Sequence, residues 1–258
     1  MASEEAALIA RIARGERLGQ ADELSSGYRA ELIRLMVVFV DSEMAGAAGF
    51  ADRINSAPGM RERATAARIV SEKFAHAETV LALLERFGVN PELYVRSHAW
   101  QARLDRTLDL GTRRTGGDKR LNVFHYPLEG WVDAVAMNML MGRASAIQLG
   151  DLVECSYRPL AEALRRIVPR EIAHARLGEA GLRRAIEHDG QRLAAAASVA
   201  YWYPRVAATF GRSDSERFEL YRTYGLRRHA NAELLARWQG EIAGRLATLG
   251  LAAPAALA

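Results

Sequence analysis

The sequence predicts an all-α protein built as a four-helix bundle, with a long crossover connection and additional peripheral helices. Half of the 258 residues are hydrophobic, which supplies a large buried core and excludes a disordered chain. Residues that favour helices dominate the composition, and there are only seven prolines. Apolar residues recur at three- and four-residue spacing over four long stretches, whereas the alternation typical of strands is nearly absent. We expect residues 1–258 to form a single domain.

The first two core helices are expected over residues 28–54 and 60–87. Ser25 offers a side-chain oxygen that can cap the first of them. Pro58 lies in the intervening turn, close to the start of the second helix, where proline is tolerated. Gly88 follows the second helix and is typical of a residue that ends a helix in the left-handed conformation. These two helices therefore form a hairpin.

The second pair of core helices is expected over residues 129–154 and 160–188. Residues 90–128 separate the two pairs, and they are too many for a simple turn in a compact bundle. Such a connection is either a crossover between two hairpins or a functional loop. Shorter peripheral helices are expected over residues 5–14, 191–210 and 231–249.

Charge and cysteine content exclude several classes of protein. The net charge of +4 comes from scattered arginines without a basic, aromatic-rich stripe, so we expect no nucleic-acid partner. The longest apolar run, residues 35–40, is too short to cross a membrane. A single cysteine, Cys155, rules out an internal disulfide framework, and we interpret it as a structural thiol. The first ten residues lack a basic signal-peptide start, so a cytoplasmic location is expected.

A Glu-x-x-His motif in the fourth core helix carries the chemistry of the chain. Glu171 and His174 are three residues apart, so both lie on one helical face and can reach one metal ion. The motif alone is a weak signal, because a surface pair or a core histidine produces the same spacing. Its context is more informative, since ferritin-like di-iron proteins use this device once in each of two hairpins.

The two predicted hairpins align on this motif. Glu43 lies 30 positions before Lys73, which begins a Lys-x-x-His sequence ending at His76. Gly142 lies 29 positions before Glu171 in the second hairpin. Of the six ligand positions in a di-iron bundle, four therefore carry residues that ligate metals. These four are Glu43, His76, Glu171 and His174.

Four further stretches make a resemblance to a known family specific. They are Ser42-Glu43-Met44-Ala45-Gly46-Ala47, Phe124-His125-Tyr126-Pro127 with Trp131, Ser156-Tyr157-Arg158-Pro159, and Trp202-Tyr203-Pro204. In order and spacing they resemble the catalytic (alpha, PaaA-type) subunit family of the bacterial phenylacetyl-CoA epoxidases, which are ferritin-like di-iron oxygenases. The resemblance implies a monooxygenase of phenylacetate catabolism. Its iron pair would use dioxygen, and electrons from a partner reductase, to epoxidise the ring of an aromatic acyl-CoA.

Two positions depart from the family pattern. Lys73 stands where the family has a bridging glutamate, and Gly142 stands where it has a carboxylate. A di-iron site uses about four carboxylates to balance two divalent ions, but here only Glu43 and Glu171 remain and a cation is added. An ammonium beside two irons costs several kcal/mol even at an effective dielectric constant of ~20. We therefore expect that any iron bound here does not form a normal di-iron centre.

Two occupants of the altered site stay open. One is a buried ion pair of Lys73 with Glu43 and Glu171, with both histidines hydrogen-bonded nearby. The other is a single metal on Glu43, Glu171 and His174, with His76 as a further ligand. Five residues are accordingly the candidate site: Glu43, Lys73, His76, Glu171 and His174. Glu72, next to Lys73, is expected behind the ligands or outside the site.

The leading functional prediction is a member of an acyl-CoA ring oxygenase system with an altered or inactive iron site. One alternative is a metal-free structural or regulatory protein that pairs with a metal-bearing paralogue. The other is a true iron oxygenase with an unusual ligand set. The expected partners are a ferritin-like paralogue or a second copy of the chain, an acyl-CoA ligand and, if the protein is active, a reductase. The residue 113–120 cluster either grips the phosphates of that ligand or forms a solvated loop.

Overall fold

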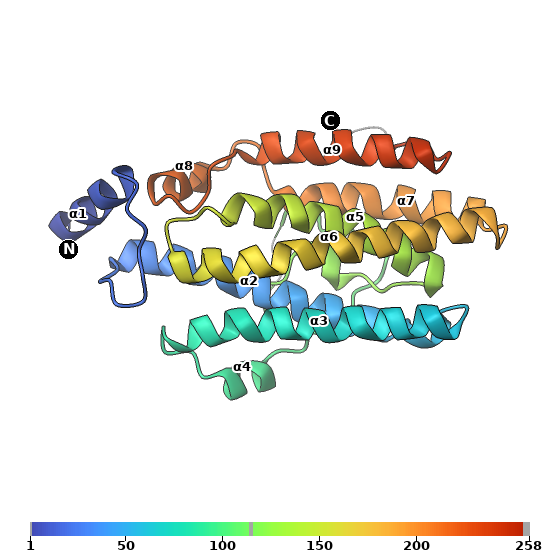
Figure 1. Ribbon diagram of the computed structural model, residues 1–258, viewed down its shortest axis with the longest axis horizontal. Coiled ribbons are helices and arrows are strands. Elements are labelled where there is room, and N and C mark those ends of the chain that lie inside the picture. The colour runs from blue at the N-terminus through green and yellow to red at the C-terminus, as the bar shows by residue number, and fades with distance from the viewer. Residues whose placement is uncertain (1, 114–115, 255–258) are drawn as a thin grey trace.

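The computed structural model describes residues 2–113 and 116–254, and it confirms the all-α, ferritin-like bundle. Two antiparallel hairpins form its centre, as Figure 1 shows. Helices α2 (Ser26–Ala51) and α3 (Met60–Glu85) make the first hairpin, and α5 (Gly130–Leu152) and α6 (Arg158–Glu187) make the second. Within the described residues there is no strand, and one isolated bridge joins Leu18 to Tyr157.

The remaining helices lie around this bundle. Helices α7 (Arg192–Ala207) and α9 (Asn231–Thr248) pack on α5, above it in Figure 1. Helix α1 (Ala2–Ala13) and helix α8 (Glu216–Thr223) lie together at one end. Helix α4 (Pro91–Ser97) projects beside α3. Each helix of the described part of the chain falls short of the length or the apolarity that crossing a bilayer needs.

Two of these helices, α4 and α8, were not predicted from the sequence. Helix α4 has seven residues and buries none of them, and α8 buries only Tyr221, so neither leaves a sustained apolar period. The capping chemistry of α4 was readable all the same. Asn90 accepts a hydrogen bond from the backbone N–H of Leu93 through its side chain, and Pro91 occupies the first turn.

The ends of the long helices follow their local sequence. The Ser25 side chain accepts a hydrogen bond from the backbone N–H of Tyr28 at 3.3 Å, so it caps α2 as predicted. Gly88 has a φ of +88°, the left-handed conformation expected just after α3. The predicted helix over residues 191–210 ends at Ala207 and continues to Phe210 as a 3₁₀ turn.

Helices α5 and α6 approach each other closely because glycines lie between them. A Cβ atom placed on Gly178 would lie 2.7 Å from the backbone nitrogen of Met139. One placed on Gly142 would lie 2.9 Å from the Cβ of Ala175. Asn138 bridges the same interface, donating from its side-chain nitrogen to the backbone oxygen of His174 at 2.9 Å. The second hairpin is therefore packed nearly backbone to backbone beside the candidate site.

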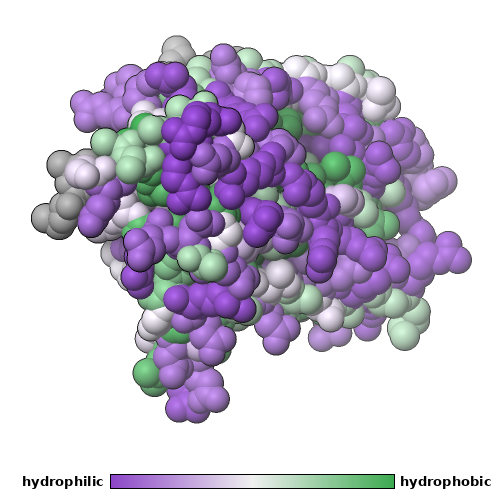
Figure 2. Space-filling view, turned by 60° about the vertical axis from the view of Figure 1, so that its left-hand side comes forward, coloured by the Kyte–Doolittle hydropathy of each residue, from purple (hydrophilic) through white to green (hydrophobic). Residues whose placement is uncertain are grey.

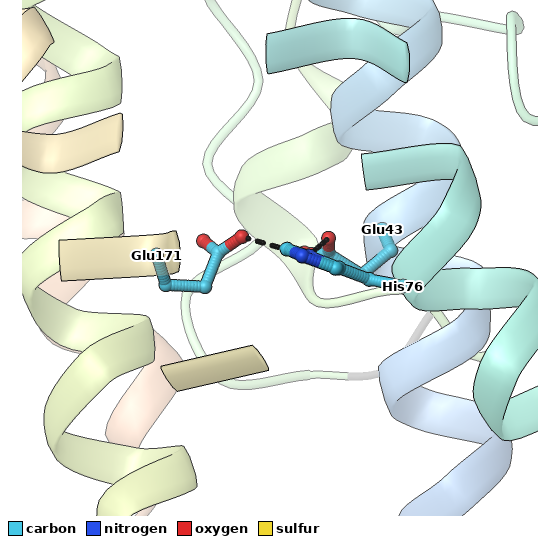
Figure 3. Close-up of side chains that lie close together, drawn as sticks. All are labelled: Glu43, His76 and Glu171. Atoms are coloured by element: carbon cyan, nitrogen blue, oxygen red, sulfur yellow. Dashed lines mark hydrogen bonds and ion pairs between the residues drawn. The ribbon is translucent and has the colours of Figure 1, made fainter. Parts of the chain in front are cut away.

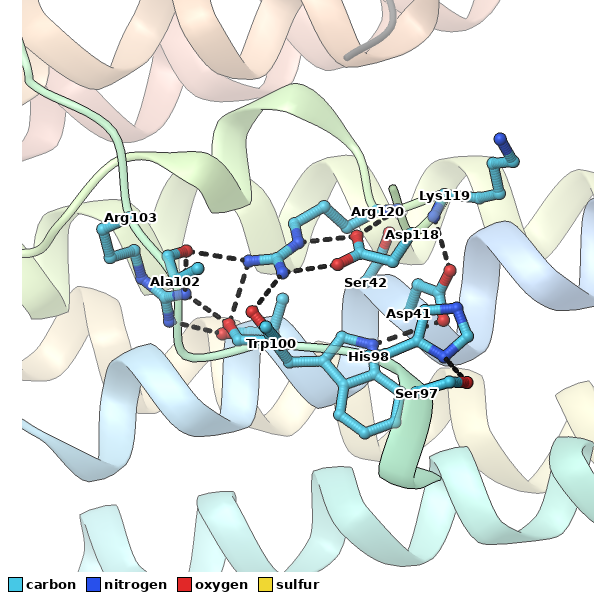
Figure 4. A network of polar contacts seen from close by, with 12 residues as sticks. Asp41, Ser42, Ser97, His98, Trp100, Ala102, Arg103, Asp118, Lys119 and Arg120 are labelled. Carbon is cyan, nitrogen blue, oxygen red and sulfur yellow. Dashed lines mark hydrogen bonds and ion pairs between the residues drawn. The ribbon is translucent and has the colours of Figure 1, made fainter. Parts of the chain in front are cut away.

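The crossover connection is fastened to α2 by one buried carboxylate. Asp41 accepts hydrogen bonds from the Tyr94 hydroxyl at 2.6 Å and from the backbone N–H of Lys119 at 2.5 Å. The indole N–H of Trp100 donates to it at 3.3 Å. Figure 4 shows these contacts around Asp41 and Ser42. Because Glu43 follows directly in the chain, this network fixes the turn of α2 that carries a candidate ligand.

Arg120 faces the interior and holds the crossover connection together. It is only 3% exposed, and its guanidinium donates to the side chain of Asp118 and to the backbone oxygens of Ala99, Trp100 and Ala102. The sequence had offered this cluster as a phosphate grip or a solvated loop, and Arg120 is neither. Arg114 and Thr115, in the same cluster, lie outside the described residues.

Candidate site in the bundle interior

Five side chains meet between the two hairpins. Glu43 comes from α2, Lys73 and His76 come from α3, and Glu171 and His174 come from α6. All five are less than 10% exposed. Figure 3 shows Glu43 and His76 on one side of the interior and Glu171 on the other, pointing toward each other. The helices therefore bring together every residue that the sequence proposed for the site.

The ammonium of Lys73 lies between the two carboxylates. Its Nζ is 3.1 Å from Glu43 Oε1, and 3.1 and 3.0 Å from the two carboxylate oxygens of Glu171. Burial alone lowers the pKa of Lys73, but the negative charges of Glu171 and Glu43 outweigh it and raise that pKa. Burial likewise favours a neutral Glu171, yet the Lys73 charge holds the pKa of that carboxyl well below its usual range. Both partners are therefore charged.

His76 adds a second positive group to the cluster. Its Nδ1 lies 3.3 Å from Glu43 Oε2 and 3.3 Å from Glu171 Oε1. Burial opposes protonation of the ring, but hydrogen bonds and charge from Glu171 and Glu43 raise the pKa of His76 to about 9. Near neutral pH, two carboxylates face one ammonium and one imidazolium. The buried charges of these four side chains therefore balance.

His174 is held from behind by Glu72. Its Nε2 lies 2.6 Å from Glu72 Oε2, and the Glu72 side chain is 28% exposed, so it reaches His174 from the edge of the bundle. The other ring nitrogen, Nδ1, is buried and has no hydrogen-bond partner, although Glu171 Oε1 lies 3.3 Å away. Glu72 thus supports a histidine and does not contact the ammonium cluster through any hydrogen bond among the described residues.

Gly142 lines a small cavity of about 40 Å³ that also touches Lys73 and Glu171. On its far side this position meets α6, where an added Cβ would lie 2.9 Å from the Cβ and 3.1 Å from the Cα of Ala175. The position faces the site, as the alignment of the hairpins predicted, but it is closed against α6. A carboxylate side chain there would require α5 and α6 to separate.

Other titratable residues lie away from this site. Cys155 is buried near the α5–α6 turn and donates a weak hydrogen bond to the backbone oxygen of Tyr157 at 3.4 Å. His229 pairs with Asp151 at 2.7 Å, and His98 stacks on Trp100. Among the described residues, the group able to hold a metal ion is Glu43, His76 and Glu171, whose ligand atoms lie within 4.8 Å of one another.

Two polar side chains that support the site were missed in the sequence. Asp41 and Asn138 are buried in α2 and α5, and each fastens an element that carries or faces a candidate ligand. Both lie inside apolar helical stretches, where a buried polar residue must find a partner. That is the one signal the sequence offered for them, and it does not say which partner.

Comparison with known proteins places the chain in a family. The family model described as "Phenylacetic acid catabolic protein" matches residues 16–258. The chain belongs to this family. Over 248 residues, this phenylacetic acid catabolic protein is 26% identical to the A component of the 1,2-phenylacetyl-CoA epoxidase of Escherichia coli (strain K12). The match covers 95% of this chain and 75% of the E. coli protein, which confirms the resemblance read from the sequence.

Proposed function

We propose that this phenylacetic acid catabolic protein is a cytoplasmic component of a multicomponent system that oxygenates the ring of an aromatic acyl-CoA. In this proposal its own iron site is replaced by an ion-pair cluster, and the chain is not itself an iron oxygenase. The family match and the similarity to a component of an epoxidase support the system. The position of Lys73 supports the altered site.

The single observation that carries the proposal is the ammonium between two carboxylates. Lys73 Nζ contacts Glu43 and Glu171 at 3.0–3.1 Å, so the charge that metal ions would neutralise is already neutralised. Two divalent irons would bring four positive charges to a site that keeps two carboxylates and two cationic side chains. The closed packing at Gly142 removes the space for a further carboxylate. These residues do not fit a normal di-iron centre.

A component without iron acts through its surfaces. We propose that it pairs with a ferritin-like, metal-bearing paralogue, and that acyl-CoA turnover and the reductase belong to that partner. The alternative is an oxygenase whose iron is held by Glu43, His76, Glu171 and His174, and it is favoured by the spacing of Glu43, His76 and Glu171. Metal content separates these two functions.

Elemental analysis of protein expressed with iron supplied is the test. We expect less than one iron per chain, and no oxygen consumption when the chain alone is given phenylacetyl-CoA and a reductant. A di-iron member of the family, expressed and purified in parallel, controls for iron loading. A stoichiometry near two irons per chain would overturn the altered-site proposal and favour the oxygenase.

A further inference from the structure

Three ligand atoms in the cluster already have the spacing that one divalent cation requires. His76 Nδ1 lies 3.3 Å from Glu43 Oε2 and 3.3 Å from Glu171 Oε1. A tetrahedral ion with bonds of about 2.0–2.1 Å holds its ligand atoms about 3.3–3.4 Å apart. The helices thus present two carboxylate oxygens and an imidazole nitrogen at the edge length of a tetrahedral site.

The orphaned nitrogen of His174 points to the same ligand class independently. His174 is 1% exposed, and its Nδ1 has no hydrogen-bond partner. The 2.6 Å contact of Nε2 with Glu72 assigns the ring proton to Nε2, because a carboxylate only accepts. The lone pair of Nδ1 then faces Glu171 Oε1, another acceptor, at 3.3 Å. A metal-ligating histidine has this arrangement, with a carboxylate behind the ring and a lone pair directed at the cation.

The charge that such a site needs is supplied by a side chain. Lys73 Nζ contacts both Glu43 and Glu171, the carboxylates of the three-residue group. An ammonium has one positive charge and bonds of 3.0–3.1 Å here, whereas a divalent ion binds the same oxygens at about 2.0–2.2 Å. The two cations cannot occupy the site together without strong repulsion.

We propose that the Lys73 ammonium stands in place of a single divalent cation, and that Lys73 is the residue that keeps metal out of the Glu43, His76 and Glu171 group. The proposal rests on the proposed function in one respect, the absence of metal from the wild-type site. It goes beyond that function in assigning the exclusion to one side chain. Removing this side chain opens a mononuclear site that the surrounding helices have kept.

The test is cobalt binding by Lys73→Ala. We expect the variant to bind one Co²⁺ per chain, with visible d–d absorption, and to release it to a chelator. Its Tm rises by roughly 5–10 °C when free cobalt is a hundredfold above Kd. The wild type, titrated under the same conditions, shows neither the absorption nor the shift. A Lys73→Ala titration identical to that of the wild type would overturn the proposal.

Three controls make the outcome specific. Lys119→Ala removes the other of the two lysines in the chain and leaves the wild-type response unchanged. Lys73→Ala/His76→Ala removes a ligand and weakens cobalt binding at least tenfold relative to Lys73→Ala. Should Lys73→Ala not fold alone, refolding with Co²⁺ supports the proposal if helical, one-cobalt protein is recovered, and overturns it otherwise. Iron in the wild type would instead contradict the proposed function, so the two failures are distinguishable.

Discussion

At the residue scale, Lys73 determines the chemistry of the bundle interior. A buried charge is tolerated only when it is paired and hydrogen-bonded, and Lys73 meets this requirement through Glu43 and Glu171. The same contacts make the three residues interdependent. If one charge is removed, the others remain buried without compensation, so substitutions here affect stability as well as metal binding.

Replacing Lys73 with alanine should destabilise the metal-free protein strongly. Deleting one partner of a buried ion pair typically costs about 3–5 kcal/mol, because the remaining charge has no partner. We expect the thermal midpoint of Lys73→Ala, measured by circular dichroism without added metal, to fall by at least about 5 °C. Lys119→Ala is the matched control, since the Lys119 backbone N–H that binds Asp41 is retained.

A double variant checks the reason for that loss. Lys73→Ala/Glu43→Gln removes one orphaned carboxylate along with its partner and should recover part of the lost midpoint. An unchanged midpoint in Lys73→Ala itself would show that the ion pair does not contribute to stability.

Cys155 gives a prediction about pH. Burial raises the pKa of its thiol to about 11, above the ordinary value of 9.0 that applies to the unfolded chain. The folded protein therefore binds this proton more tightly, and the resulting stability is complete below pH 9 and is lost as the pH rises through 11. Denaturant melts of wild type and Cys155→Ala from about pH 8 to 11 should show the smaller alkaline loss in the variant. Parallel curves would contradict the prediction.

At the element scale, the α5–α6 interface determines what the site can hold. Gly142 and Gly178 let the two helices approach until a Cβ at either position would contact the neighbouring helix at 2.7–2.9 Å. The family carboxylate expected at position 142 from the sequence therefore cannot be restored by substitution alone. The loss of a ligand and the closure of the interface belong together.

Gly142→Ala should accordingly destabilise the protein, although alanine favours helices. Overpacking of this kind typically costs about 1–3 kcal/mol, and Gly142→Asp should cost more because it also buries a charge. Gly150 is the matched control on the same helix, since a Cβ there meets nothing within 4 Å. We expect Gly150→Ala to gain about 0.5–1 kcal/mol in the free energy of unfolding measured by urea titration.

The neighbouring residue on α6 offers a rescue. Gly142→Ala/Ala175→Gly removes the Cβ that lies 2.9 Å from the new side chain and should recover part of the loss. If Gly142→Ala is as stable as Gly150→Ala, the helices are free to separate and the restored carboxylate becomes feasible.

At the scale of the whole molecule, the two hairpins share their core with the peripheral helices. One apolar cluster joins α5, α7 and α9, and a second joins α2, α3 and α6 with the N-terminal segment. Met44 and Tyr94 contact both clusters. The face in Figure 2 is largely hydrophilic, with small apolar patches, in keeping with arginines spread over a solvated surface.

We expect residues 1–258 to unfold as one cooperative unit, which is the test of a single domain. All four tryptophans lie in or against the first cluster, so their fluorescence reports that cluster alone. Far-ultraviolet circular dichroism reports the helices of both clusters. Urea transitions followed by the two probes should coincide. Separate midpoints would show that the clusters fold independently.

The sequence by itself determined the helical class, the two hairpins and the five residues of the candidate site. Apolar spacing and caps such as Ser25 and Gly88 are local features, so they can be read along the chain. The short helix α4 escaped because it buries no residue. Only the tertiary structure decided which atoms meet: the shared oxygens around Lys73, the orphaned nitrogen of His174 and the closed position of Gly142. These depend on the rotation and separation of helices that lie far apart in the chain, which periodicity does not specify.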